Sequence, residues 1–180
     1  MSLDDGYRRI GADPFLPPVE ERDPPRRLRG RLATPVTVWT AYDGAGVPAG
    51  ITVSSVLVVE GEPAQVVGLL GPLSDFWGAV QATKRFVLHV LGAGDVRTSE
   101  LFALRYPGDP FEELSVTAGD WGPVLDGCRT SASCSLTGYL EVGPGVLARG
   151  VMDEVEAADE PPLPLVHYRG KYLTVGPRPA

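Results

Sequence analysis

Short runs of β-branched and apolar residues, separated by turns that contain glycine or proline, dominate the chain from Leu32 onward. Such runs are typical of strands, because β-branched side chains favour extended backbone and turn residues end it. The predicted strands cover 35–41, 49–59, 64–70, 85–91, 128–142, 146–157 and 165–175, the last one continuing past an interruption at Gly170. The first three are expected to form a meander, and the run at 85–91, apolar on both faces, indicates a central strand.

Two short helices are expected within this β pattern. One is predicted from Ser74 to about Thr83, since Ser74 is a suitable N-cap and apolar residues recur at helical spacing behind it. The other is expected between 97 and 105. Six or seven short strands with one or two short helices predict a mainly β protein, an antiparallel barrel of Greek-key type.

Residues 1–31 differ in composition from the rest of the chain. They contain seven arginines, six acidic residues and five prolines, so neither a helix nor a central strand is expected over most of this segment. We therefore divide the chain into a Pro/Arg-rich N-terminal arm, 1–31, and one domain, 32–180. Two interpretations of the arm remain open: a loosely ordered segment, or an arm that wraps a partner subunit with its arginines facing an acidic body.

The overall charge narrows the choice of partners and location. A net charge of −7 argues against nucleic acid or an anionic membrane as the main partner, because basic patches bind both. The longest unbroken apolar runs, such as Val56–Val59, are too short to span a membrane, and no secretory signal is visible in the first 25 residues. A cytoplasmic protein is expected.

Cysteine and histidine usage excludes several kinds of site. Cys128 and Cys134 are six residues apart in a predicted extended segment, so about 20 Å separates them and free thiols are expected. His89 and His167 are the two histidines, and neither has a partner at metal-binding spacing, so no metal site is expected. The nucleophile-elbow, P-loop and GxGxxG motifs do not occur.

Several short motifs occur in a characteristic order. They are GITVSS at 50–55, the turn Glu62-Pro63, Ser74 at a helix start, FxxHxL at 86–91, GPVLDG at 122–127 and PLVHYRGKY at 164–172. In order and spacing, residues 32–175 resemble the flavin reductase-like family with the FMN-binding split β-barrel fold. The resemblance implies a homodimer that passes a hydride from NAD(P)H to FMN or FAD and in many cases supplies a partner monooxygenase.

The resemblance implies a flavin site along Thr52, Val53, Ser54 and Ser55. An isoalloxazine ring is a flat, largely apolar plate with hydrogen-bonding atoms along one edge. A strand end that presents backbone N–H groups and short hydroxyls fits such a ring. Trp77, in the first turn of the predicted helix, is a further candidate for stacking on the ring, with packing in the core or at a subunit interface as the alternative.

The expected phosphate end departs from the family pattern. The family usually carries a Ser-Arg-Thr cluster at the start of the helix, whereas here Ser74 precedes Asp75 and Phe76. A carboxylate about 5 Å from a phosphate costs roughly 3 kcal/mol at an effective dielectric near 20. The phosphate is therefore expected to depend on other groups as well, with Lys84 and Arg85 as the nearest candidates; a solvated helix end is the alternative for these two.

The C-terminal motif departs too, because His167 and Tyr168 are exchanged relative to the family order of an aromatic residue, histidine and arginine. Successive side chains on a strand point to opposite faces. Either His167 lines the nicotinamide site on a shifted strand, or Tyr168 stacks there while His167 is an inert surface residue. Both are candidate catalytic residues, and Arg169 is a candidate cofactor ligand. His89 is expected to be a hydrogen-bonded core residue rather than a proton donor.

We therefore expect an NAD(P)H-dependent flavin reductase that acts on FMN or FAD, with the reductase component of a two-component monooxygenase as one such role. Hydride transfer between two rings needs neither a protein nucleophile nor a metal. The alternative is a flavin-binding or degenerate split-barrel protein without reductase activity. A dimeric interaction module with an empty barrel is the third hypothesis.

Overall fold

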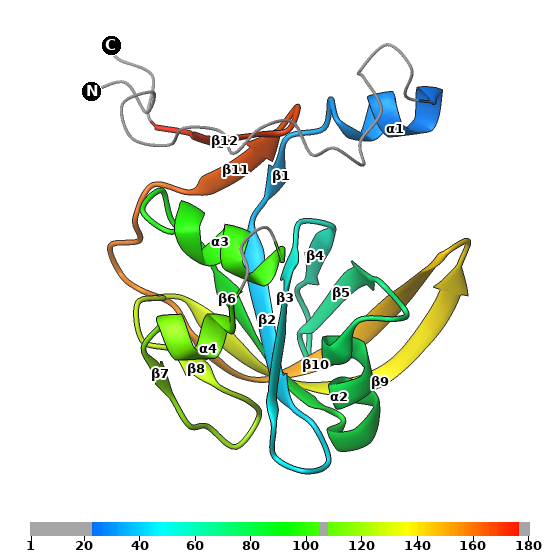
Figure 1. The fold of residues 1–180 in the computed structure, drawn as a ribbon, viewed down its shortest axis with the longest axis vertical. Coiled ribbons are helices and arrows are strands. Elements are labelled where there is room, and N and C mark those ends of the chain that lie inside the picture. Colours follow the sequence, from blue (N-terminus) through cyan, green and yellow to red (C-terminus); the bar gives the residue numbers. More distant parts are fainter. Residues whose placement is uncertain (1–22, 105–107, 177–180) are drawn as a thin grey trace.

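The computed structural model describes residues 23–104 and 108–176. Its centre is a seven-stranded antiparallel sheet in the order β3-β2-β6-β9-β10-β5-β4 (Figure 1). The strands are β2 (Thr37–Tyr42), β3 (Pro48–Val53), β4 (Val56–Val59), β5 (Gln65–Leu70), β6 (Arg85–Val90), β9 (Ser131–Val142) and β10 (Gly145–Glu156). The mainly β class is confirmed, and β6 is the central strand that its two apolar faces predicted.

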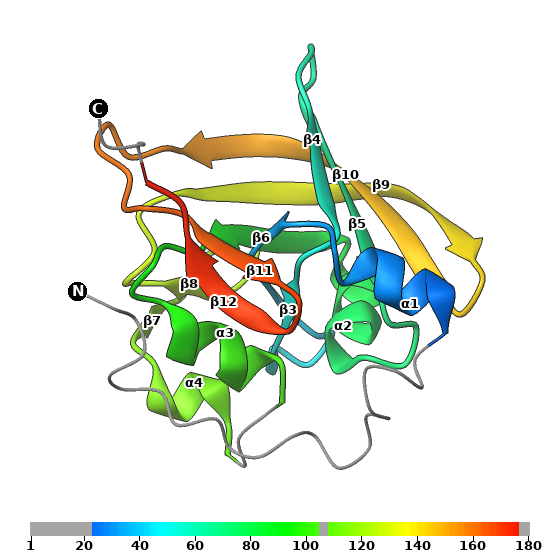
Figure 2. The same cartoon turned by 90° about the horizontal axis from the view of Figure 1, so that it is seen from above.

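Smaller elements surround this sheet. β1 (Thr34–Pro35), β11 (Leu165–Tyr168) and β12 (Lys171–Thr174) form a second sheet, and β7 (Val116–Thr117) pairs with β8 (Val124–Leu125). The helices are α1 (Pro24–Arg29), α2 (Asp75–Thr83), α3 (Val96–Phe102) and α4 (Pro110–Glu113). Figure 2 shows the β11–β12 hairpin lying over α3, with α1 beside the hairpin turn.

Two of these helices were predicted and two were not. The predicted helix at 74–83 is confirmed as α2, with Ser74 as its N-cap, and the prediction at 97–105 corresponds to α3. α1 and α4 are six and four residues long, and both have proline in the first turn. Proline is tolerated there because the first N–H groups of a helix have no intrahelical acceptor. These prolines indicated a break in the sequence pattern but begin short helices in the structure.

An aromatic cluster forms the main core between α2 and the sheet. The rings of Trp39 and Phe86 stack with centroids 4.9 Å apart, and Phe76 from α2 meets both rings edge-on. All three side chains are fully buried. Burial of three large aromatic side chains contributes several kcal/mol, so this cluster anchors α2 against β2 and β6.

Gly68 on β5 leaves the space that this cluster needs. A Cβ at position 68 would lie 2.4 Å from Cη2 of Trp39, whose opposite face is held by Phe86. Gly68→Ala is therefore expected to lower the free energy of unfolding by about 2 kcal/mol. Gly78→Ala, at an exposed position in α2 with nothing within 4 Å of the added Cβ, is the control and is expected to raise it by roughly 0.5–1 kcal/mol. Chemical denaturation measures both, and equal effects would contradict this account of the core.

The predicted three-stranded meander over 35–70 is wrong. The strand expected at 49–59 is broken at Ser54 and Ser55 into β3 and β4, which do not pair with each other. β3 pairs with β2, whereas β4 pairs with β5 at the other edge of the sheet. The two edge strands are thus consecutive in the chain and are joined by Ser54 and Ser55. We call these two residues the β3–β4 corner.

The single last strand predicted at 165–175 is also wrong, because the chain forms a hairpin there. β11 and β12 are antiparallel and are joined by Arg169 and Gly170, whose φ angles are 49° and 77°. Positive φ at both central residues is typical of a tight hairpin turn. Arginine rarely adopts this conformation, and so the sequence did not predict the reversal.

The free thiols are confirmed, although Cys128 is not in the strand predicted for it. β9 begins at Ser131, and the N–H of Cys128 donates to the carbonyl of Leu125 in a turn before that strand. Both cysteines are free. Burial raises the pKa of each thiol to about 12, so neither has the character of a reactive thiolate.

Candidate functional site

The β3–β4 corner carries unused hydrogen-bonding groups. Ser54 and Ser55 are half-buried. The carbonyl of Ser55 accepts from the N–H of Leu69 at 3.0 Å. Within residues 23–104 and 108–176, neither the N–H groups nor the hydroxyls of these two serines donate a hydrogen bond. Because partly buried polar groups are normally paired, two adjacent free N–H groups with two free hydroxyls offer a place for a ligand with acceptor atoms along one edge.

The two preceding residues of the predicted flavin segment have structural contacts instead. The hydroxyl of Thr52 donates to the carbonyl of Ser99 in α3 at 2.6 Å. The side chain of Val53 is only 3% exposed and belongs to the main core. Gly50 also has a packing role, since a Cβ there would lie 2.5 Å from the ring of Phe102. Of the four predicted residues, Ser54 and Ser55 are the two whose hydroxyls donate to no other described residue.

A chain of contacts connects this strand to the predicted nicotinamide motif. Ser99, whose carbonyl accepts from Thr52, is fully buried, and its hydroxyl hydrogen bonds with the hydroxyl of Tyr172 on β12 at 2.9 Å. The ring of Tyr172 meets the ring of His167 edge-on across the hairpin, with centroids 5.7 Å apart. The structure therefore places Thr52 and His167 in one connected neighbourhood through α3.

The Ser99–Tyr172 hydrogen bond is expected to stabilise this arrangement. Ser99→Ala and Tyr172→Phe should each lower the free energy of unfolding by about 1 kcal/mol, the typical net value for such a bond. Because both variants remove the same bond, the double variant should cost little more than either one. Chemical denaturation of the four proteins measures the coupling. Additive losses would show that the two hydroxyls do not act as a pair.

His167 and Tyr168 point to opposite faces of the hairpin. His167 is half-buried and lies opposite Tyr172, and thus on the side whose side chains reach α3. Tyr168 is also half-buried and lies opposite Lys171. Arg169 occupies the turn and is exposed. Of the two candidate catalytic residues, His167 therefore faces the side that is linked to the predicted flavin strand.

The predicted phosphate ligands lie at opposite ends of α2. The hydroxyl of Ser74 accepts from the N–H of Trp77 and donates to the carbonyl of Gly71, so capping uses it fully. Lys84, with a φ of 62°, ends the helix, and Arg85 begins β6. Nine helical residues span about 13 Å, and a helix C-terminus disfavours an anion. The structure does not bring Ser74 together with Lys84 and Arg85 at one phosphate.

Trp77 is packed inside the protein. Its side chain is 3% exposed and meets the ring of Tyr139 on β9 edge-on, with centroids 5.1 Å apart. This burial corresponds to the packing alternative for Trp77, and it leaves little of the ring available to a ligand bound to a single subunit.

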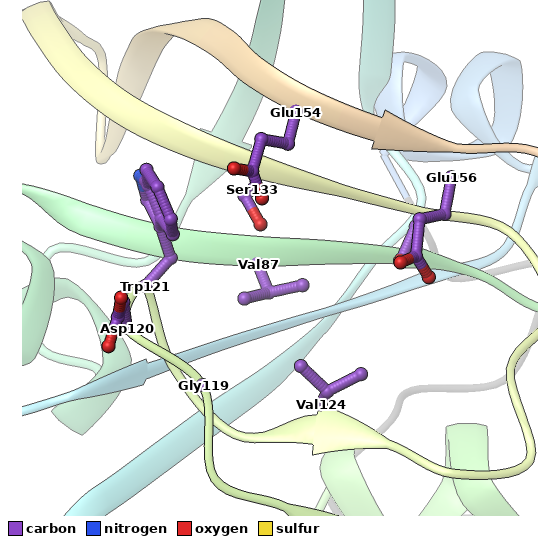
Figure 3. Close-up of a pocket in the computed structure, with 9 residues that line it drawn as sticks. Val87, Gly119, Asp120, Trp121, Val124, Ser133, Glu154 and Glu156 are labelled. Atoms are coloured by element: carbon purple, nitrogen blue, oxygen red, sulfur yellow. The ribbon is translucent and has the colours of Figure 1, made fainter.

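A cavity that the sequence did not predict lies on the other side of the central strands. It measures about 270 Å³ and is lined by Val87, Gly119, Asp120, Trp121, Val124, Ser131, Ser133, Glu154 and Glu156 (Figure 3). None of the predicted site residues lines it, although the guanidinium of Arg85 lies 5.5 Å from the Trp121 ring centroid. Three carboxylates repel a flavin phosphate, and the volume is below the range of about 300–1,000 Å³ usual for ligand sites. A flavin phosphate is therefore not expected in this cavity.

His89 is a hydrogen-bonded core residue, as predicted. It is fully buried; its Nδ1 lies 3.2 Å from the carbonyl oxygen of Val38, and its Nε2 accepts from the N–H of Leu125 at 3.1 Å. These partners assign the proton to Nδ1 of a neutral ring. Burial lowers the pKa of His89 to about 4. A neutral side chain with both nitrogens occupied is a structural link, not a proton donor.

Comparison with known proteins identifies the family. The family model described as flavin reductase like domain matches residues 29–176. The protein therefore belongs to the flavin reductase-like family, and the resemblance carried by the sequence motifs is confirmed. Among the described residues, no helix combines the length and apolar character needed to cross a membrane.

Individual relatives agree with this assignment. The chain is 35% identical over 154 residues to the NADH-dependent FMN reductase AsuE2 of Streptomyces nodosus subsp. asukaensis, covering 83% of each protein. It is 31% identical over 157 residues to HsaB, the reductase subunit of a flavin-dependent monooxygenase from Rhodococcus jostii (strain RHA1), covering 85% of this chain and 79% of HsaB.

Solved structures share the fold. A homologue of nitrilotriacetate monooxygenase component B from Mycobacterium thermoresistibile superposes with a TM-score of 0.77 at 28% identity, covering 86% of this chain and 88% of that one. The NADH:FAD oxidoreductase SgcE6 of Streptomyces globisporus has a TM-score of 0.78 at 23% identity, covering 91% and 98%. At 23% identity, the similarity to SgcE6 is evidence for a shared fold only.

Proposed function

We propose that the protein is an NAD(P)H-dependent flavin reductase whose flavin binds at the β3–β4 corner. The observation that carries this proposal is the pair of serines at the corner, half-buried and with free N–H and hydroxyl groups. Family membership and relatives named as NADH-dependent flavin reductases give the chemistry. FMN or FAD is the flavin, and NADH is the reductant that the names of these relatives favour over NADPH.

The residues at the corner fit the edge of an isoalloxazine ring. The N–H groups of Ser54 and Ser55 would donate to the carbonyl oxygens and ring nitrogens along that edge, and the two hydroxyls would adjust to either polarity. Thr52 would act indirectly, by holding β3 against α3 through Ser99. The bound flavin supplies the hydride acceptor, so the protein is required to position two rings and to exclude water.

His167 is the side chain we place next to the nicotinamide. It lies on the face of the β11–β12 hairpin whose Tyr172 contacts α3, and α3 in turn holds Thr52. An imidazole N–H there would donate a hydrogen bond to the carboxamide and orient the ring. Tyr168 and Arg169, on the other face and in the turn, would contact more distant parts of the cofactors.

A second copy of the chain would complete this site, and we propose a homodimer of split β-barrels. The outer face of β4, β5, β10 and β9 is largely apolar and carries Arg149 beside Val67. Leu69, Leu147 and Leu140 are successive cross-strand neighbours on it, and Leu57 lies opposite Val67. Leu57 is 69% exposed and Leu140 is 63% exposed. An apolar face of this extent indicates a protein interface. This face adjoins the β3–β4 corner, because Ser55 and Leu57 are two residues apart in an extended chain and their side chains point to the same side.

The same proposal covers the protein's wider role. Relatives named as reductase subunits of monooxygenases support reduced flavin as the product delivered to an oxygenase component. Two free thiols favour a reducing, cytoplasmic location.

The division into an arm, 1–31, and a domain, 32–180, stays a prediction, because residues 1–22 lie outside the described part of the chain.

Flavin titration followed by a rate measurement tests the function. FMN added to the purified protein should show a perturbed visible spectrum, and NADH oxidation should then depend on both flavin and protein. FMN binding without NADH or NADPH oxidation would support the flavin-binding alternative without reductase activity. No binding of FMN or FAD would support the empty interaction module and contradict the proposal.

A further inference from the structure

A cluster of positive side chains lies where α1 meets the β11–β12 turn. It consists of Arg26, Arg27, Arg29, Arg31, Arg169 and Lys171, all of them exposed. We call it the basic patch. The backbone N–H of Arg169 donates to the carbonyl of Gly30 at 3.0 Å, which holds the two segments together. Figures 1 and 2 both show α1 beside the turn of the hairpin.

The basic patch has no neutralising partner in the part of the chain that the structure describes. The ion pair found there joins Arg97 to Glu113 and involves none of the six residues. Asp23, the N-cap of α1, is the acidic residue that adjoins the patch, and it forms no ion pair with any described residue. Residues 24–35 and 161–180 contain no aspartate or glutamate. Six positive charges gathered on a chain of net charge −7 are mutually repulsive, and a bound anion would relieve that repulsion.

Two of the arginines share a hollow. Arg27 and Arg31, together with Pro24 and Leu28, line a depression of about 160 Å³. A planar guanidinium donates two parallel hydrogen bonds to a phosphate or a carboxylate. A terminal phosphate has three free oxygens, so it can accept from both arginines of the depression, and a halide lacks this geometry. Residues 24–31 make no contribution to the site described above.

The basic patch adjoins the proposed nicotinamide contact. His167 lies two residues before Arg169, and the residue paired with it on β1 is Thr34, three residues after Arg31. In a redox nucleotide, the phosphate is separated from the reactive ring by one ribose or ribityl group. Because only one such group separates the two, a phosphate attached to a ring beside His167 can extend toward the basic patch, which begins two residues further along the chain at Arg169.

We propose that the basic patch binds the phosphate groups of the redox nucleotide used by the site. The inference rests on the proposed function, because that function supplies the ligand. The shared chemistry is a phosphate monoester or pyrophosphate, and it can come from the flavin or from the nicotinamide nucleotide. Binding by six exposed charges is mainly electrostatic and therefore weakens with salt.

The double variant Arg27→Gln, Arg31→Gln tests the proposal. Arg129→Gln is its control, because it removes a positive charge from an exposed position outside the basic patch and outside the proposed dimer face. Dissociation constants for FMN, riboflavin and ADP are measured by calorimetry, and KM values for NADH and reduced nicotinamide riboside by rate. We expect the first variant to weaken binding of phosphate-bearing ligands about tenfold at low salt, and less above ~0.15 M salt.

The pattern of losses identifies the source of the phosphate. A loss for FMN but not riboflavin assigns the patch to the flavin, and a loss for NADH but not the riboside assigns it to the nicotinamide nucleotide. Unchanged binding of every ligand, equal losses for ligands without phosphate, or a change in oligomeric mass with unchanged binding would each overturn the inference. A wild-type protein that oxidises neither NADH nor NADPH contradicts the proposed function. In that case the calorimetric measurements with FMN, riboflavin and ADP still show whether the basic patch binds phosphate.

Discussion

Replacing Ser55 with tryptophan is expected to abolish flavin binding while the protein still folds. Ser55 is half-buried at the β3–β4 corner, and its carbonyl, which the substitution keeps, accepts from the N–H of Leu69. An indole at this position would occupy the space that we assign to the isoalloxazine edge. We expect FMN binding to weaken at least about a hundredfold, equivalent to the loss of about 3 kcal/mol, and flavin reduction to fall with it.

A matched substitution separates this effect from a general loss of structure. Ser115→Trp inserts the same side chain at an exposed serine on the loop between α4 and β7 and should leave the FMN titration unchanged. Circular dichroism and thermal melting of both variants report whether they fold. A Ser55→Trp protein that is folded and binds FMN as the wild type does would exclude the corner as the flavin site.

The stability of the protein is expected to fall as the pH is lowered from neutrality toward 4, because of His89. The pKa of this histidine is lowered from 6.5 to about 4 by burial. Between these values the unfolded chain takes up a proton that the folded protein excludes, so acid favours unfolding. Above pH 6.5, neutral His89 contributes its full share of the free energy of unfolding. At pH 4, about 3 kcal/mol of that free energy has been lost.

His89→Gln isolates this contribution from that of the carboxylates. Glutamine can accept from the N–H of Leu125 and donate to the carbonyl of Val38, but it does not titrate. The variant is expected to be less stable than the wild type at pH 7 and to show a flatter dependence of unfolding free energy on pH between 6.5 and 4. Parallel pH profiles for the two proteins would show that His89 does not carry the effect.

The strands that follow local pattern were predictable, and those that depend on distant contacts were not. β6 was recognisable because a strand covered on both faces carries apolar residues at every position. The break between β3 and β4 has no such local signal. The run from 49 to 59 is uniformly favourable to strand, and only the pairing of its halves with β2 and β5 divides it at Ser54 and Ser55. The sequence did not predict the turn at Arg169, because arginine rarely adopts the positive φ angle that this turn requires.

The candidate site shows the same limit. Motif order correctly indicated the family, and the resemblance predicted a flavin site along 52–55. It did not reveal that the hydroxyl of Thr52 is bonded to α3, or that Gly50 accommodates Phe102. Ser74, Lys84 and Arg85 are close in sequence to one helix, yet nine helical residues separate them in space. Assigning side chains to a shared ligand requires the tertiary fold.

A crystal structure of the protein with bound FMN tests the central claim most directly. The account predicts the edge of the isoalloxazine ring within hydrogen-bonding distance of the backbone N–H groups of Ser54 and Ser55, next to the apolar face that carries Leu57. Flavin bound instead in the acidic cavity beside Trp121, with the two serine N–H groups left unpaired, would contradict it.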